Sequence, residues 1–190
     1  MRYSTVINII LIPGYGCTYD YLMPLGNFLK EKGYKIHTPE GIAPNFHKIS
    51  DCIKIIKEYI EKNNLSNVIL IGHSKGGIIA RYLLNEKELK NTIKKAITIS
   101  SPHKGSLLAI YSRFNAHEMI PWSKTTRNIN KQKDNLDKVL NIYGIHDRIV
   151  IPSSNLHLPG AKNIKTNIKG HSKTVASPEV WQIILKEISK

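Results

Sequence analysis

The feature that most restricts how this chain can fold is a repeated pair: a short apolar run rich in β-branched residues, followed by a longer segment with helical spacing of its apolar residues. The apolar runs include residues 4–14 (STVINIILIPG), 67–72 (NVILIG), 94–100 (KKAITIS) and 138–144 (KVLNIYG). They are apolar on both faces and do not alternate, which is typical of parallel strands covered by helices on both sides. The pattern predicts an α/β fold with right-handed crossovers.

Two further strands are expected, which makes about six in all, and four helices are expected between and after them. The strands are expected at residues 34–38 and 163–170, and the helices at 21–33, 46–64, 77–84 and 177–188. The last helix has Ser177 as its N-cap and Pro178 at its first position.

The length of 190 residues fits a single domain, residues 1–190. Only residues 102–138 break the rhythm of strands and helices. This segment is long for a connection, so we expect either a functional loop region or a helix with an irregular short cap.

Composition places the chain among globular proteins, because 41% of its residues are hydrophobic and 22% are charged. Its two cysteines, Cys17 and Cys52, argue against a disulfide framework and suit a reducing compartment. The first residues lack the pattern of a secretory signal, and no apolar run is long enough to span a bilayer. We therefore expect a cytoplasmic protein.

The formal net charge of +14 is compatible with a polyanionic partner, such as nucleic acid, an anionic membrane surface or an acidic substrate. However, the 28 Lys and Arg residues are spread evenly, and the chain is also rich in Ile and Asn, so compositional drift explains the charge better. We do not expect nucleic-acid binding. Transient contact with an anionic membrane surface remains open, and no pattern indicates an oligomeric state.

The segment GHSKG, residues 72–76, matches the G-x-S-x-G pattern of a nucleophile elbow and lies between a predicted strand and a predicted helix. Such an elbow holds its serine, here Ser74, on a sharp turn that tolerates only glycine at the flanking positions. The alternative is a glycine-rich turn in which Ser74 only caps the helix. No phosphate loop is present, and Tyr19 replaces the third glycine of a dinucleotide fingerprint, so no cofactor is expected.

A serine nucleophile needs a base and a group that orients the base. Asp147 follows the predicted strand 138–144 and is the only carboxylate between Asp137 and Glu179. His171 follows the last predicted strand and precedes the terminal helix. The order Ser, Asp, His at the carboxyl ends of successive strands predicts a catalytic triad of Ser74, Asp147 and His171.

Other histidines have weaker claims on the role of base. His157 is the serious rival, but His171 is favoured because it occupies a strand-to-helix loop. His73 is expected to pack or hydrogen-bond structurally. His103 either lines the pocket or braces its loop. No set of His, Cys and carboxylate residues has metal-ligand spacing, so no metal is expected.

Two backbone amides are expected to form the oxyanion hole: that of Lys75, directly after the serine, and that of Tyr15, in the glycine loop after the first strand. A cation at a helix N-terminus is unfavourable. We therefore hypothesise that the Lys75 side chain biases the pocket toward anionic or phospho-headgroup esters. The residues that could line the pocket are His103, Cys17 and Trp122.

Four segments together resemble the α/β-hydrolase superfamily, most closely the small lipase-type and GPI-inositol-deacylase-like esterases. They are IILIPGYG (9–16), LIGHSKGG (70–77), TISSPHKGS (98–106) and the C-terminal segment 142–184 with the Asp147 and His171 loops. The resemblance implies a minimal α/β-hydrolase with a mostly parallel central sheet of about six strands, and ester hydrolysis through a serine acyl-enzyme. Pro13 and Lys75 depart from residues common in these families, which bears on substrate class.

The expected substrate is a small-molecule ester or lipid, and residues 106–122 are the segment that could form an acyl pocket or dock on a lipid interface. An ordinary sheet-covering helix and loop would explain the same residues. Two alternatives to a carboxylic ester hydrolase are a catalytically silent hydrolase fold that acts as a binding protein, and a thioesterase or amidase that uses the same triad.

Overall fold

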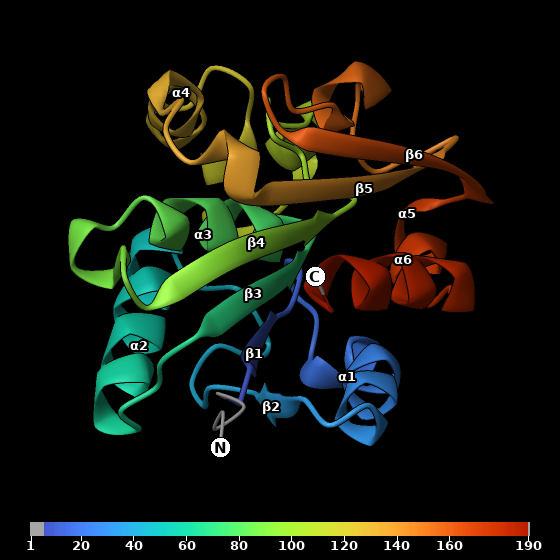
Figure 1. The fold of residues 1–190 in the computed structure, drawn as a ribbon. Helices are drawn as coiled ribbons and strands as arrows, with labels where there is room; N and C mark the ends of the chain where they lie inside the picture. The colour runs from blue at the N-terminus through green and yellow to red at the C-terminus, as the bar shows by residue number, and fades with distance from the viewer. Residues whose placement is uncertain (1–5, 190) are drawn as a thin grey trace.

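The computed structural model describes residues 6–189, which form a six-stranded sheet in the order β2-β1-β3-β4-β5-β6 (Figure 1). Every neighbouring pair in the sheet is parallel. The strands are β1 (Asn8–Ile12), β2 (Lys35–His37), β3 (Val68–His73), β4 (Ile93–Ile99), β5 (Val139–Ile145) and β6 (Lys162–Lys169). The expected parallel α/β sheet is therefore confirmed.

Helices cover both faces of the sheet, as the apolar strands predict. The helices are α1 (Met23–Glu31), α2 (Ile49–Lys62), α3 (Lys75–Leu84), α4 (Lys124–Lys131), α5 (His171–Val175) and α6 (Pro178–Ile188). Helices α2 and α3 pack on one face, and α1 and α6 pack on the other (Figure 1). Alternate residues of β1 serve the two faces: Ile10 and Ile12 join the α2–α3 cluster, whereas Ile9 and Leu11 join the α1–α6 cluster.

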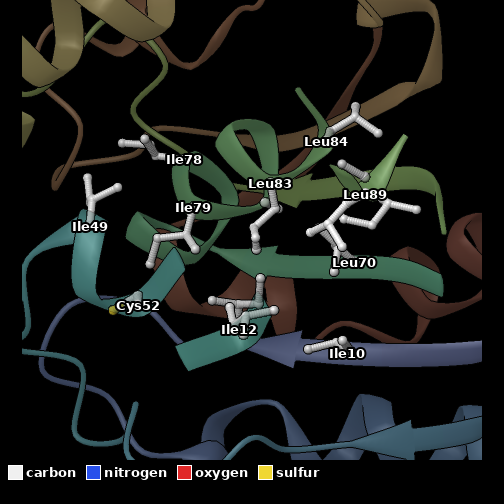
Figure 2. Close-up of a cluster of buried hydrophobic side chains, with 14 of the residues drawn as sticks. Ile10, Ile12, Ile49, Cys52, Leu70, Ile78, Ile79, Leu83, Leu84 and Leu89 are labelled. Carbon is white, nitrogen blue, oxygen red and sulfur yellow. The ribbon is translucent and has the colours of Figure 1, made fainter. Parts of the chain in front are cut away.

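The core between the sheet and α3 holds the elbow helix in place. Figure 2 shows Ile12 and Leu70 of the strands beside Ile79 and Leu83 of α3, and all four are fully buried. Burying each such side chain contributes about 1.5–3 kcal/mol. The start of α3 is therefore positioned rigidly against the carboxyl ends of β1 and β3.

Strand β2 lies on one side of β1 in the sheet, and β3 lies on the other side. The direction in which successive strands are added therefore changes between β1 and β3. In open α/β sheets such a switch point leaves a crevice outside the carboxyl ends of the two strands. The Gly14 loop follows β1 and Ser74 follows β3, so the fold places both at this crevice.

Some local expectations need correction. Helix α3 begins at Lys75 and not at residue 77. Strand β6 has only one buried residue, Thr166, and its other residues are exposed or partly buried, unlike those of the other long strands, because it lies at the edge of the sheet. Ser177 stands at the N-cap of α6, with Pro178 first in the helix, but its side chain makes no capping hydrogen bond.

Residues 102–138 contain short helices joined by irregular segments. These are the 3-10 helices η3 (Leu107–Tyr111), η4 (Phe114–Met119) and η5 (Leu136–Lys138), together with α4. Glu118 in η4 accepts a hydrogen bond from the Ile49 N–H at the start of α2, at 2.8 Å. The segment is thus attached to the helix layer beside the crevice.

Candidate active site

Ser74 occupies a strained turn between β3 and α3, with φ 54° and ψ −120°. This positive φ is rare for a residue with a side chain. Ser74 stands at the N-cap of α3, yet its hydroxyl makes no capping hydrogen bond. The geometry therefore gives no support to a purely capping role.

Both glycines of the pattern are required by close backbone approach. A Cβ at Gly72 would lie 2.3 Å from the carbonyl carbon of Gly76, and one at Gly76 would lie 2.1 Å from the oxygen of Ile12. Any side chain at either position would therefore push α3 away from the sheet. The sharp turn at Ser74 depends on these two contacts.

His171 begins α5, and its Nδ1 lies 2.7 Å from Oδ2 of Asp147. The other carboxylate oxygen, Oδ1, accepts hydrogen bonds from the backbone N–H groups of Ile149 at 2.8 Å and Val150 at 2.9 Å. Both oxygens are thus committed, and the carboxylate cannot rotate freely. This arrangement presents the far nitrogen of His171, Nε2, for proton transfer.

Burial alone would raise the pKa of Asp147, but the hydrogen bond from His171 and the two backbone amides outweigh it. The net result is a pKa below the usual value of 3.8. Asp147 therefore remains a carboxylate at neutral pH and favours a proton on the Nδ1 of His171.

Ser74 and His171 line one pocket of about 240 Å³ at the carboxyl edge of the sheet. Gly14, Tyr15 and Cys17 of the loop after β1 form part of its wall. Its apolar wall consists of Leu108, Ala109, Met119, Ile149 and Val150. The structure thus brings together all three predicted triad residues, since Asp147 supports His171 from behind.

The loop after β1 lies directly against the serine, because a Cβ at Gly14 would be 3.1 Å from the Cβ of Ser74. Asn45 braces this loop. Its side-chain amide donates to the backbone oxygen of Pro13 at 2.7 Å, and its backbone oxygen accepts from the Gly16 N–H at 3.1 Å. Within residues 6–189, the backbone N–H groups of Tyr15 and Lys75 donate to no protein acceptor outside their own helix or strand.

The side chain of Lys75 does not face the pocket, contrary to the hypothesis that it selects anionic esters. It is fully buried, donates to the backbone oxygen of His47, and places Nζ 5.8 Å from the centre of the Tyr15 ring. Burial lowers the pKa of this ammonium group. The sequence could not show this, because it did not indicate which side of the helix start faces the substrate.

Of the proposed pocket residues, only Cys17 lines the pocket. His103 is fully buried, and its Nε2 lies 3.0 Å from Oδ1 of Asn141, while its Nδ1 lies 3.3 Å from Arg81. Burial is also the main reason that the pKa of His103 falls to about 3. His103 therefore braces its loop and does not line the pocket. Trp122 is 57% exposed and also lies outside the pocket wall.

The rival histidine is placed elsewhere. His157 lines a separate hollow of about 520 Å³, where its Nδ1 lies 3.3 Å from the hydroxyl of Tyr143. His73, in contrast, packs its ring against His171, with the ring centres 4.9 Å apart. Burial lowers the pKa of His73 to about 3, so this ring is neutral.

Sequence reasoning named residues 106–122 as a segment that could form the acyl pocket, but it did not identify the individual wall residues and did not include Ile149 and Val150. Leu108, Ala109, Ser112 and Met119 lie in η3, in η4 or between them, and Ser106 just before η3. The only signal was the apolar content of residues 106–122, which equally fits an ordinary helix. The described residues contain no group of three or more His, Cys, Asp or Glu side chains that could hold a metal ion.

The parallel sheet, the elbow and the crevice at the carboxyl edge together define an α/β hydrolase. Solved structures share this fold: a Bacillus licheniformis lipase matches with a TM-score of 0.75 and 15% identity, over 98% of this chain and 94% of that one. An α/β hydrolase from a Moroccan lagoon metagenome matches with a TM-score of 0.70 and 21% identity, over 96% and 90%.

Residues 42–186 match the family model described as the PGAP1-like alpha/beta domain, and the chain belongs to this family. A GPI inositol-deacylase of Kluyveromyces lactis is 28% identical over 123 residues, which cover 60% of this chain and 12% of that protein. Triacylglycerol lipase 2 of Saccharomyces cerevisiae is 33% identical over 101 residues, which cover 48% of this chain and 30% of that protein. The chain therefore corresponds to a small part of each relative.

Across residues 6–189, every helix is too short or too polar to cross a bilayer.

Proposed function

We propose that this protein is a serine hydrolase that cleaves carboxylic esters through Ser74, His171 and Asp147. The observation that carries the proposal is the His171–Asp147 pair at 2.7 Å, in a pocket that His171 shares with a strained Ser74. A purely structural serine would not need a buried, doubly hydrogen-bonded carboxylate behind a histidine in the same pocket.

The proposed reaction has two halves. The Ser74 hydroxyl attacks the ester carbonyl carbon while Nε2 of His171 takes its proton, and the resulting oxyanion binds the amides of Tyr15 and Lys75. Collapse of this intermediate expels the alcohol, which receives the proton from His171. Water then attacks the acyl-enzyme with His171 as base, releasing the carboxylic acid and restoring Ser74.

The apolar wall of the pocket favours an acyl group as the part of the substrate that it holds. At about 30 Å³ for each water-sized group, a volume of about 240 Å³ accommodates a short acyl segment. Relatives are named for lipase and GPI inositol-deacylase activity, which supports acylated lipids as the substrate class. We propose that residues 102–138 form a short cap, because η3 and η4 supply this wall.

A fluorophosphonate probe, combined with a series of aryl esters of increasing acyl length, tests the proposal. Wild type and Ser112→Ala, which alters another pocket-wall serine, should both take the label and cleave esters. Ser74→Ala should do neither. An unlabelled, inactive wild type would instead favour a silent binding fold, and faster cleavage of the matching thioester or amide would reassign the substrate class.

A further inference from the structure

Large apolar side chains are unusually exposed on the segments beside the pocket. We call them the apolar collar: Phe46 at 36%, Leu107 at 38%, Ile110 at 41%, Tyr111 at 85%, Phe114 at 66%, Ile149 at 51% and Ile151 at 37% exposed. Scattered exposed apolar residues are normal, but a contiguous group marks an interaction site.

Direct contacts join the three segments of the collar. The Leu107 N–H donates to the Ile151 oxygen at 2.8 Å, which ties η3 to the loop after β5. The rings of Phe46 and Phe114 lie 5.1 Å apart, which ties η4 to the loop before α2. Ile149 belongs to the collar and also lines the pocket. The collar therefore borders the pocket that contains Ser74.

Positive charge accompanies the collar. The sequence has no Asp or Glu in residues 104–116 or in residues 148–178, the stretches that carry six of the seven collar residues. Arg113, Arg148 and Lys48 are exposed and lie within two residues of a collar residue. Among the ion pairs of residues 6–189, none involves these three cations. Their charges are free to meet an anionic surface.

We propose that the apolar collar and these cations dock the protein on an anionic lipid bilayer, so that the pocket opens toward an ester held in that surface. The proposal rests on the proposed function for its purpose. Apolar and aromatic side chains insert into the headgroup region while Lys and Arg attract anionic lipids. A second copy of this chain fits less well, because it would bring the same cations and a net charge of +14 against them.

Vesicle binding tests the docking surface independently of catalysis. The Ser74→Ala protein is mixed with vesicles of phosphatidylcholine alone, or of phosphatidylcholine with phosphatidylglycerol, and the bound fraction is measured by sedimentation. We expect binding to the anionic vesicles and at least tenfold weaker binding to the neutral ones. Tyr111→Ser with Phe114→Ser should weaken the anionic binding at least tenfold.

Arg113→Gln with Arg148→Gln should weaken that binding about thirtyfold, since each basic residue contributes about 1 kcal/mol near such a surface. Two matched controls should bind as the parent does: Trp122→Ser, an exposed aromatic outside the collar, and Lys90→Gln with Lys94→Gln, exposed cations at the amino edge of the sheet. Circular dichroism spectra and thermal unfolding midpoints equal to those of the Ser74→Ala parent show that the variants fold.

The proposal is overturned if neither vesicle type is bound, if the control changes weaken binding as much as the collar changes, or if neutral vesicles bind equally well. A dimer that Tyr111→Ser with Phe114→Ser dissociates, without vesicle binding, would assign the collar to self-association. Failure of the fluorophosphonate label with intact vesicle binding would reject the proposed function and leave the docking surface standing.

Discussion

Asp147 makes more hydrogen bonds than its position after a predicted strand suggests. One carboxylate oxygen accepts hydrogen bonds from two backbone N–H groups, and the other faces the Nδ1 of His171. A carboxylate fixed in this way orients the imidazole and stabilises it when it is charged.

Asp147→Asn should lower kcat by about 10⁴-fold, because an amide holds His171 in the wrong tautomer. It should also reduce stability at neutral pH by about 1.5–3 kcal/mol, the contribution of hydrogen bonds to a charged group. The folded-state pKa of Asp147 is depressed, so this stability is present above the unfolded value and is lost as pH falls through the folded pKa. Chemical denaturation of both proteins between neutral pH and acid should show the difference shrinking below about pH 4. A constant difference would contradict this account.

Lys75→Met tests the reassignment of the buried lysine. Replacing a buried cation by an apolar residue of similar length should leave stability equal or raise it by about 1–4 kcal/mol. Burial lowers the pKa of Lys75, so the cationic form costs stability below the folded pKa, and this cost fades as pH rises toward 10.5. The ratio of kcat/KM for neutral and anionic esters should stay unchanged. A shift toward neutral esters would return the Lys75 side chain to substrate selection.

At the scale of elements, the sharp turn at Ser74 forms because β1, β3 and the start of α3 approach one another more closely than side chains at Gly72 and Gly76 would allow. The oxygen of Ile12 in β1 would touch any Cβ at Gly76 in α3. The same closeness brings the loop after β1 within reach of Ser74. The geometry of the elbow and the position of the loop after β1 therefore depend on the same close packing.

Gly76→Ala should destabilise the protein by about 1–3 kcal/mol or more through overpacking, and should abolish labelling of Ser74. Gly26→Ala is a matched control in α1, where the nearest atom to the new Cβ is a flexible methyl of Leu11 at 3.0 Å. The control gains helix propensity of up to about 1 kcal/mol and should keep its label. Thermal unfolding and probe labelling measure both effects. Equal behaviour of the two variants would contradict the packing argument.

At the scale of the whole molecule, the chain has 28 basic and 14 acidic residues. Repulsion between the excess positive charges therefore destabilises the compact folded state. Ion pairs such as Lys57–Glu86 at 2.8 Å and Lys95–Glu187 at 2.6 Å offset part of it. Exposed or partly exposed pairs contribute only about 0–1 kcal/mol each. Repulsion should therefore dominate the response to salt.

The free energy of unfolding should increase when ionic strength rises from about 0.01 M to about 0.15 M, because the Debye length falls from about 30 Å to about 8 Å. Urea denaturation at several NaCl concentrations measures this, with sucrose at matched osmolality as a control for general solute effects. A decrease in stability with salt would mean that the surface ion pairs outweigh the repulsion.

The parallel sheet, the elbow and the order of the polar loops could all be predicted from the amino-acid sequence. These are local properties: apolar runs predict buried strands, and GHSKG allows a turn that other residues forbid. Because carboxyl ends of parallel strands meet at one edge, the order Ser74, Asp147, His171 was enough to predict that these residues meet. Their catalytic roles remain proposals.

The directions in which the intervening side chains face could not be predicted and depend on the three-dimensional packing. The Lys75 side chain is buried with its ammonium group near the Tyr15 ring, His103 lies in a buried polar network, and His157 lines a separate hollow. Residues 106–119 also lie over the pocket, although their own pattern fits an ordinary helix equally well. These positions depend on packing between segments far apart in the chain, and local periodicity and spacing do not encode such packing.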